Sequence, residues 1–407
     1  MIWLEIPKSL KPLADMAQQV GANVFRPISR KYDAAEHAYP KELDALASLM
    51  NGMNAAGSGA GAGAAAGAKD KKAKKERDPN EIINGANLAT ILGVEQLCWG
   101  DVGLMLSIPG QGLGNAAIAA VATPEQLERF GDKWAAMAIT EPSAGSDSAA
   151  IQTTARLDGD EWVINGEKIF VTAGERADAV VVWATLDRNL GRAAIKSFVV
   201  EKGTPGMELI RLDKKMGIRA SDTAVLSFSD CRIPKENILG SPEIDTKKGF
   251  AGVMQTFDNT RPMVAAMAIG VGRAALEHTR TLLAKEGIEV RYDQGVKSGS
   301  AIEAELRRME AELEAARLLT LKAAWMADNR RPNSVEASMS KAKAGRTGTE
   351  IALRCVELCG AAGYSEDDLL EKWARDAKIL DIFEGTQQIQ LLIIARRLLG
   401  LTSAQLR

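Results

Sequence analysis

The composition and the hydrophobic pattern of the sequence change twice along the chain, and these changes limit the folds that the chain can adopt. Residues 134 to about 240 consist of short runs rich in Val, Ile, Thr, Phe and Trp, separated by Gly, Asp and Asn. The clearest runs are residues 162–164, 179–184, 195–200 and 224–228. Such runs are typical of β-strands, and the Asp-Gly and Asn-Gly pairs at 158–159 and 165–166 favour tight hairpin turns. We therefore expect a compact antiparallel barrel or sandwich in the middle of the chain.

Helical spacing occupies the chain on both sides of this β region. Apolar residues recur at intervals of three or four over residues 10–50 and 79–130. On the C-terminal side the same pattern covers residues 249–285, 301–329, 334–360 and 386–399. Four helices of this length with short connections predict a bundle. The predicted fold is mainly α with a β domain: an N-terminal α-helical domain (1–133), a middle β-barrel (134–243) and a C-terminal four-helix bundle (244–407).

A low-complexity insertion interrupts the first helical region. Residues 55–68 are almost only Gly, Ala and Ser, and a charged run follows them at 69–78. Such a segment lacks the apolar side chains that would offset the entropy of ordering it. We interpret residues 55–78 as a flexible linker that ends in a solvated charge cluster, in preference to a specific partner-binding arm.

The charge balance and the rarer residue types argue against several classes of function. The formal net charge of −2 does not suit a nucleic-acid scaffold or a basic membrane anchor. No apolar run approaches the ~20 residues of a membrane span, and residues 1–8 lack the features of a secretory signal, so we expect a cytoplasmic protein. The four cysteines and two histidines lack metal-ligand spacing, which argues against a zinc site or a Cys/His nucleophile. Acid–base chemistry near neutral pH therefore falls to a carboxylate.

A turn rich in small residues stands at the start of the β region. Residues 137–147 read MAITEPSAGSD, which combines the end of an expected strand with hydroxyl side chains and backbone N–H groups. Such a turn can approach a planar ring or a phosphate group closely. Taken alone, a cluster of Ser, Gly and Pro most often only makes a turn.

The T-E-P-x-A-G-S-D pattern in this turn resembles the flavin-binding loop of the acyl-CoA dehydrogenase family. Residues 165–172 (NGEKIFVT) are similar to the family's barrel hairpin, in which Phe170 stands where many members have Trp. Residues 257–262 (FDNTRP) resemble the helix that lines the acyl pocket, and residues 382–390 (IFEGTQQIQ) resemble the family's base motif. The resemblance extends over nearly the whole chain apart from the linker, and it implies the same order of helical domain, barrel and bundle.

Glu384, within the last of these motifs, is the candidate catalytic base. A simpler interpretation is that its carboxylate interacts with the N-terminus of the following helix, which Thr386 would cap. However, a glutamate in a Gly-flanked turn can point into an apolar cleft, where loss of solvation raises its pKa toward neutrality. Its backbone N–H can also donate to a developing oxyanion. Residues 252–256, where some sub-families carry the base, read GVMQT and contain no carboxylate.

The resemblance implies oxidation of an acyl-CoA thioester to the trans-2-enoyl-CoA, with FAD as the cofactor. Glu384 would remove the α-proton, and the β-hydrogen would leave as hydride to the flavin ring. Thr140 would hydrogen-bond the ring edge that gains negative charge, and Thr172 would lie near the nitrogen that accepts hydride. The implied FAD contacts are Met137, Ile139, Thr140, Gly145, Ser146, Phe170, Val171, Thr172, Thr386 and Gln388. Ser146, Asp258 and Arg261 would contact the thioester, although Asp258 could merely cap a helix and Arg261 could pair with a carboxylate.

Three functional interpretations stay open at this point. A dehydrogenase would pass its electrons to an electron-transfer flavoprotein. An acyl-CoA oxidase would pass them to dioxygen, but the chain lacks the long C-terminal extension typical of oxidases. A non-catalytic subunit of a heteromeric dehydrogenase would have no need to retain Glu384.

The chain departs from the family pattern at two positions where, in homotetrameric members, a neighbouring subunit contacts FAD. Glu289 lies near the place of a family arginine, and Glu357 replaces a glutamine. Carboxylates would repel a diphosphate there, although Arg291 could compensate. We therefore predict an oligomer, and specifically a hetero-oligomer in which a homologous second subunit supplies the missing Arg and Gln.

Overall fold

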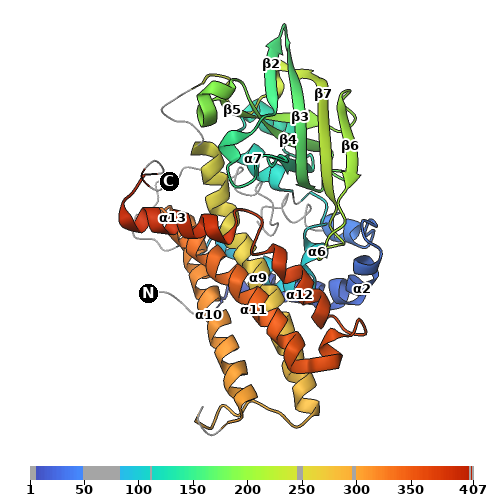
Figure 1. Ribbon diagram of the computed structural model, residues 1–407, viewed down its shortest axis with the longest axis vertical. Coiled ribbons are helices and arrows are strands. Elements are labelled where there is room, and N and C mark those ends of the chain that lie inside the picture. The colour runs from blue at the N-terminus through green and yellow to red at the C-terminus, as the bar shows by residue number, and fades with distance from the viewer. Residues whose placement is uncertain are drawn as a thin grey trace.

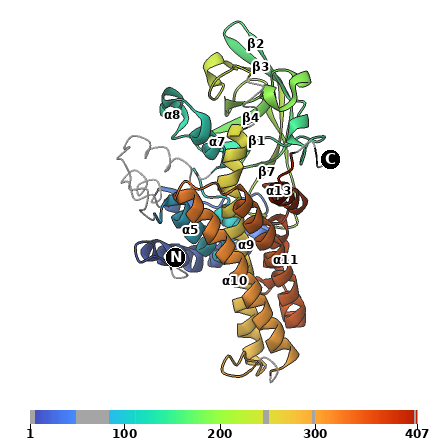
Figure 2. The same ribbon diagram turned by 90° about the vertical axis from the view of Figure 1, so that its left-hand side faces the viewer.

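The computed structural model describes residues 6–48, 83–110, 112–244, 251–295, 299–402 and 405, with the backbone alone for residues 251–259. The low-complexity insertion lies outside these ranges. In the described part, long helices form one end of the molecule and a curled sheet forms the other (Figure 1). A perpendicular view shows the same separation (Figure 2). The predicted sequence of helices, β region and helices is confirmed.

Two of the N-terminal helices begin at side-chain caps. The side chain of Asp101 accepts a hydrogen bond from Leu104 N (2.8 Å) at the start of α6. Thr123 and Gln126 form a reciprocal capping box at the start of α8. The elements are α1 (Lys11–Val20), a π-helical turn (Gly21–Phe25), α2 (Arg26–Ala34), α5 (Ala86–Gly100), α6 (Val102–Met105), α7 (Leu113–Val121) and α8 (Pro124–Phe130).

The β region forms one curled, mixed sheet. Its strands are β1 (Ala135–Ala138), β2 (Thr154–Asp158), β3 (Glu161–Thr172), β4 (Ala179–Thr185), β5 (Ile195–Glu201), β6 (Met207–Leu212) and β7 (Thr223–Pro234). The order is β1-β4-β2-β3-β7-β6, and β5 pairs with the whole length of β4 along its other edge. The expected antiparallel pairing holds except where β1 and the start of β2 run parallel to β4. A purely antiparallel sheet was therefore a wrong prediction, because β4 returns beside strands that precede it by a crossover and not by a hairpin.

One of the two predicted hairpin turns is absent. Gly159, with a φ of +64°, does turn the chain between β2 and β3. The Asn165-Gly166 pair instead lies inside β3, where the pairing with β7 shifts register between Ile164 and Gly166. A Cβ atom on Gly166 would lie 2.4 Å from Thr153 Oγ1, so glycine is needed here for close approach at a β-bulge.

The C-terminal helices match the predicted periodicity, with one addition. They are α9 (Ala251–Lys285), α10 (Ala301–Asp328), α11 (Ser334–Tyr364), α12 (Leu370–Ile379) and α13 (Gln387–Leu399). The short helix α12 was not predicted. Gly360 has a φ of +55° and kinks α11 without ending it, whereas Gly400 ends α13 in the left-handed conformation. None of the described helices is both long and apolar enough to cross a membrane.

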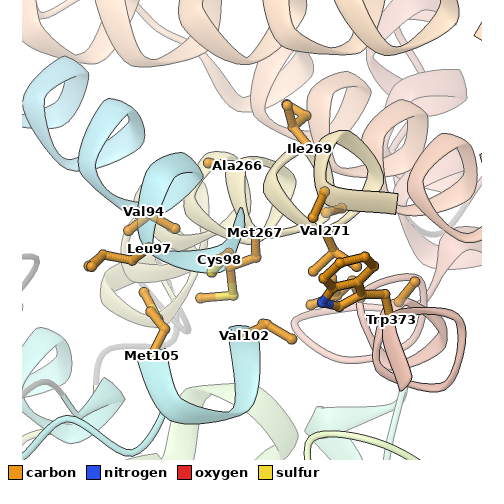
Figure 3. Packing of buried hydrophobic residues seen from close by; sticks show 14 of the residues in the cluster. Val94, Leu97, Cys98, Val102, Met105, Ala266, Met267, Ile269, Val271 and Trp373 are labelled. Carbon is orange, nitrogen blue, oxygen red and sulfur yellow. The ribbon is translucent and has the colours of Figure 1, made fainter. Parts of the chain in front are cut away.

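The N-terminal and C-terminal helices share one hydrophobic core. Val94 and Leu97 of α5 lie in the same cluster as Met267 and Val271 of α9 and Trp373 of α12 (Figure 3). The curled sheet encloses a separate core. A third cluster joins α7 and α8 to the sheet. The predicted domain boundaries stay a prediction.

A buried cluster of charges joins these helices to the sheet. Lys372 of α12 pairs with Asp101 (2.7 Å) and Asp376 (2.5 Å), and all three side chains are buried. Asp376 accepts a hydrogen bond from Ile218 N (2.5 Å) in the loop between β6 and β7, and Asp101 accepts one from Ser29. Burial alone would lower the pKa of Lys372, but the two carboxylates raise it above its usual value. The cluster thus connects α2, α6, α12 and the sheet at one point.

Candidate active site

A cleft of about 1260 Å³ lies where the curled sheet meets the helices. Its walls come from the loop after β1, from β3, from the loop after β6, and from helices that include α5, α9 and α13. Apolar side chains such as Ile91, Met105, Met263 and Ile389 line the helical side. The cleft is therefore partly shielded from solvent. Polar groups of the sheet and of the turn before α13 line it.

The loop that follows β1 is anchored by a buried ion pair. Lys168 Nζ lies 2.7 Å from Glu141 Oε1, and both side chains are buried. Glu141 also accepts hydrogen bonds from Gln152 N (2.5 Å) and Thr153 N (2.9 Å). Lys168 donates a second hydrogen bond to Ile139 O (3.1 Å). The T-E-P motif pointed to this loop, but sequence reasoning missed its anchor, because nothing local marks Lys168 as the partner of a glutamate 27 residues earlier.

Phe170 presents an exposed aromatic ring to the cleft. The residue is 62% exposed and has a φ of +58°. A register shift between Lys168 and Val171 in the pairing of β3 with β7 marks a second bulge, and a bulge re-aims the side chains beside it. Phe170 and Thr172 consequently line the cleft, whereas Val171 packs inside the sheet's core. A large ring held exposed by a strained backbone is typical of a ligand contact.

Glu384 lies in the tight turn between α12 and α13. Its φ is +56° and that of Gly385 is +89°, a region that non-glycine residues occupy only when contacts hold them there. Thr260 Oγ1 donates to Glu384 Oε2 at 2.9 Å. Gln390 Nε2 donates to the carbonyl oxygens of Glu384 and Gly385, each at 3.1 Å. Lys341 Nζ donates to Gly385 O at 2.8 Å. These contacts hold both the backbone of the turn and the carboxylate.

The surroundings of the Glu384 carboxylate change its acidity. Burial raises its pKa above the usual range for a glutamate. The hydrogen bond from Thr260 and the positive charges of Arg261 and Lys341 lower the pKa in part. A carboxylate with a raised pKa is a stronger base than one in water, so this environment suits proton abstraction.

The cleft collects most of the residues that the sequence singled out. Those that line it are Met137, Ile139, Thr140, Gly145, Ser146, Phe170, Thr172, Arg261, Glu384 and Thr386. Thr386 also caps α13 by accepting a hydrogen bond from Ile389 N (3.3 Å), so Glu384 is not needed as a cap. Val171 and the exposed Gln388 do not line the cleft, and the side chain of Asp258 lies outside the described residues. The ligand contacts of all these residues stay predictions.

Support for the Glu384 turn comes from residues that sequence reasoning did not single out. Thr260 belongs to the FDNTRP motif, so the motif carried a signal, although only its neighbours were chosen. Gln390 is the last residue of the IFEGTQQIQ motif, so this motif also carried a signal that was not used. Lys341 lies in a helix where the sequence shows periodicity alone. Its role depends on which segments pack together, which local patterns do not reveal.

The acidic positions that depart from the family pattern lie on the surface. Glu289 and Glu357 are both exposed, and Glu357 pairs with Arg354. Arg291 is bound within the chain, because its Nε and Nη2 atoms lie 3.0 and 2.9 Å from the carboxylate of Glu303. Arg291 is therefore already paired with a carboxylate of its own chain.

Comparison with known proteins gives one consistent result. The acyl-CoA dehydrogenase middle domain matches residues 136–231, and the acyl-CoA dehydrogenase C-terminal domain matches residues 247–399. The mitochondrial short-chain specific acyl-CoA dehydrogenase of Bos taurus is 38% identical over 330 residues, which cover 78% of this chain and 78% of that protein. The short-chain specific acyl-CoA dehydrogenase of Clostridium acetobutylicum is 35% identical over 322 residues, which cover 77% of this chain and 83% of that protein.

A solved structure extends the similarity to nearly the whole chain. Butyryl-CoA dehydrogenase from Megasphaera elsdenii has a TM-score of 0.82 and 31% identity, and the match covers 98% of this chain and 100% of that chain. Fold and relatives thus define an oxidoreductase. The chain belongs to the acyl-CoA dehydrogenase family, whose members depend on a flavin.

Proposed function

We propose that this protein binds FAD in the cleft and oxidises an acyl-CoA thioester to its trans-2-enoyl-CoA, with Glu384 as the base for the α-proton. The observation that carries the proposal is the geometry of Glu384. Its carboxylate has a raised pKa, is held by Thr260, and lines the same cleft as the loop after β1 and Phe170. An electron-transfer flavoprotein is the proposed electron acceptor.

The residues of the cleft fit both FAD and a CoA thioester. Phe170 offers an aromatic face, and Thr140, Ser146 and Thr172 offer hydroxyl groups. The basic side chains that line the cleft are Arg192, Arg211, Lys214, Lys215, Arg261, Arg375, Lys378 and Arg396, against the carboxylates Asp213 and Glu384. Arg211, Arg375 and Lys378 pair with carboxylates of the chain. The positive charge of the other basic side chains suits the phosphate groups of both molecules. FAD, when bound, supplies the ring that accepts the β-hydrogen of the substrate as hydride.

The protein's own residues would prepare the α-proton for removal. Glu384 takes this proton in its ionised form, while Thr260 holds its Oε2 atom. The backbone N–H of Glu384, in the strained turn, is the proposed donor to the thioester carbonyl oxygen, where it would stabilise the developing negative charge. Arg261 and Asp258, both on α9, are the proposed contacts for the rest of the thioester chain. The apolar walls keep the base poorly solvated and therefore strong.

The experiment that tests this function is a panel of acyl-CoA thioesters with the FAD-loaded protein and an artificial electron acceptor. The names of the relatives, short-chain and butyryl-CoA dehydrogenases, make short acyl chains the first substrates to measure. We expect formation of the enoyl-CoA product without oxygen consumption. Oxygen consumption that accounts for the product would identify an oxidase, and no turnover on any chain length would refute the proposal.

A hetero-oligomer is the proposed assembly. Glu289 and Glu357 are exposed, and by the family resemblance they would face the FAD diphosphate bound by a neighbouring subunit, where carboxylates are unfavourable. Arg291 is already paired with Glu303. A homologous second subunit that carries Arg and Gln at these positions would complete the site of this chain. Its own site would then face the carboxylates and bind FAD poorly.

Expression with and without candidate paralogues tests this assembly. The measured quantity is FAD per polypeptide in the purified complex, together with its subunit composition. We expect about one FAD for two polypeptides in a mixed complex and little FAD on this chain alone. A stable homo-oligomer with one FAD in each subunit and full activity would contradict the prediction.

A further inference from the structure

Helix α11 supports the turn that carries Glu384 through two residues one helical turn apart. Lys341 and Gly345 lie at positions i and i+4, and therefore share one face of the helix. Lys341 Nζ donates to Gly385 O at 2.8 Å. A Cβ atom on Gly345 would lie 2.7 Å from the carbonyl oxygen of Leu380, so the chain before the turn packs directly on the helix backbone. This face of α11 fixes the path of the chain into the turn.

Lys341 buries a charged side chain, which costs more free energy than a purely structural contact requires. It is 0% exposed and does not line the cleft. A neutral donor could make the hydrogen bond to Gly385 without the cost of burying a charge. Burial lowers the pKa of Lys341 to about 8, although the charges of Asp381 and Glu384 raise it in part and that of Arg261 lowers it. At neutral pH the side chain of Lys341 is mainly a cation. It lies against the turn that carries Glu384.

We propose that Lys341 is a positioning residue for Glu384: it holds the Gly385 carbonyl and places a positive charge on the turn that carries the base, which favours the ionised carboxylate before substrate binds. The proposal rests on the proposed function of Glu384. A general base acts only when unprotonated, and a nearby positive charge favours the carboxylate over the neutral acid. Arg261 on α9 contributes charge of the same sign, and Asp381 is a carboxylate that also interacts with Lys341. Lys341 also contacts the backbone of the turn, because its Nζ donates to Gly385 O.

Removal of this charge has a defined effect on the pH dependence of turnover. Without it, the pKa of Glu384 rises further, so kcat/KM begins to fall at a higher pH on the acid side. A shift of about one pH unit is expected for the loss of a charge in a buried setting. One unit of pKa is a tenfold change in the ionised fraction of Glu384 at low pH. At pH values well below this pKa, kcat/KM of the variant is therefore about tenfold lower than that of the wild type.

The test compares pH profiles of kcat/KM for the FAD-loaded wild type and four variants. Lys341→Gln removes the charge and keeps a donor, Lys341→Met removes both, and Lys341→Arg keeps the charge. Lys343→Gln is the matched control, because Lys343 lies on the same helix and pairs with Glu312 at the surface. We expect the apparent pKa of the acid limb to increase by about one pH unit in Lys341→Gln and Lys341→Met. In Lys341→Arg and Lys343→Gln it should change by less than ~0.3 unit.

The outcomes separate this proposal from the proposed function. If both neutral variants turn over with the wild-type acid limb, the proposal is overturned and the role of Glu384 stands. An equal shift in Lys341→Arg would assign the effect to packing and overturn it as well. If circular dichroism and bound FAD show that only Lys341→Arg folds, Lys341 serves the fold and not the base, and the proposal fails. A wild type without any acyl-CoA turnover would refute the proposed function itself, and this proposal with it.

Discussion

Glu384→Gln is expected to lower acyl-CoA turnover by roughly 1000-fold or more while the protein still binds FAD. The amide keeps the size of the side chain and can still contact Thr260, but it cannot accept the α-proton at any working pH. The backbone of the turn is held separately by Gln390 and Lys341, so the substitution leaves the shape of the site intact. The measurement is single-turnover kinetics at pH 7 to 8 with the best substrate of the panel, alongside the flavin content.

The matched control for this variant is Glu336→Gln. Glu336 lies in the first turn of α11, pairs with Lys322, and does not line the cleft, so the same chemical change there should leave turnover unaltered. Activity of Glu384→Gln within tenfold of the wild type would show that another group removes the proton.

Lys372→Met is expected to reduce the free energy of unfolding by about 3–5 kcal/mol, because it removes one partner of a buried ion cluster. Asp101 and Asp376 are fully buried and would be left with like charges and no counter-ion. Their remaining hydrogen bonds, among them those from Leu104 N and Ile218 N, cannot offset the loss of solvation. The measurement is the shift of the thermal or urea unfolding midpoint of the FAD-loaded protein.

Lys343→Met serves as the control for this substitution, because Lys343 is a partly exposed lysine whose ion pair with Glu312 lies at the surface. It should change stability by less than about 1 kcal/mol. A similarly small change for Lys372→Met would contradict the prediction, because it would show that the folded state does not depend on the charge of Lys372.

Much of the fold could be predicted because the local periodicity of apolar residues indicates the helices and strands. The β-type runs and the long helical patterns appear where β3, β4, β5, β7, α9 and α10 lie. What failed depended on partners distant in sequence. The Asn165-Gly166 pair carries a strong turn signal, yet Thr153 and the partner strand turn it into a bulge. The ten residues of α12 are a different case, because a local signal was overlooked: the buried residues Leu370, Trp373, Ala374 and Ala377 recur at helical spacing.

The candidate site was predictable only where a motif carries it. Glu384 and the loop around Thr140 belong to such motifs, and the structure brings them to one cleft. Lys168 and Lys341 were missed, because each is one lysine among many until the fold places it beside Glu141 or Gly385. Sequence motifs thus identified groups that line the cleft, whereas the groups behind them required the tertiary structure.

The shared helical core constrains how the protein can be made on the ribosome. Phe25 and Leu92 belong to the same buried cluster as Ala265 and Trp373, and helix α5 packs directly on α9. A nascent chain that has just completed β7 carries the strands of the described sheet but neither α9 nor α10, which pack on α5. The apolar face of this early helix stays uncovered until most of the polypeptide has emerged. Newly synthesised chains therefore expose apolar surface during this interval, which favours aggregation.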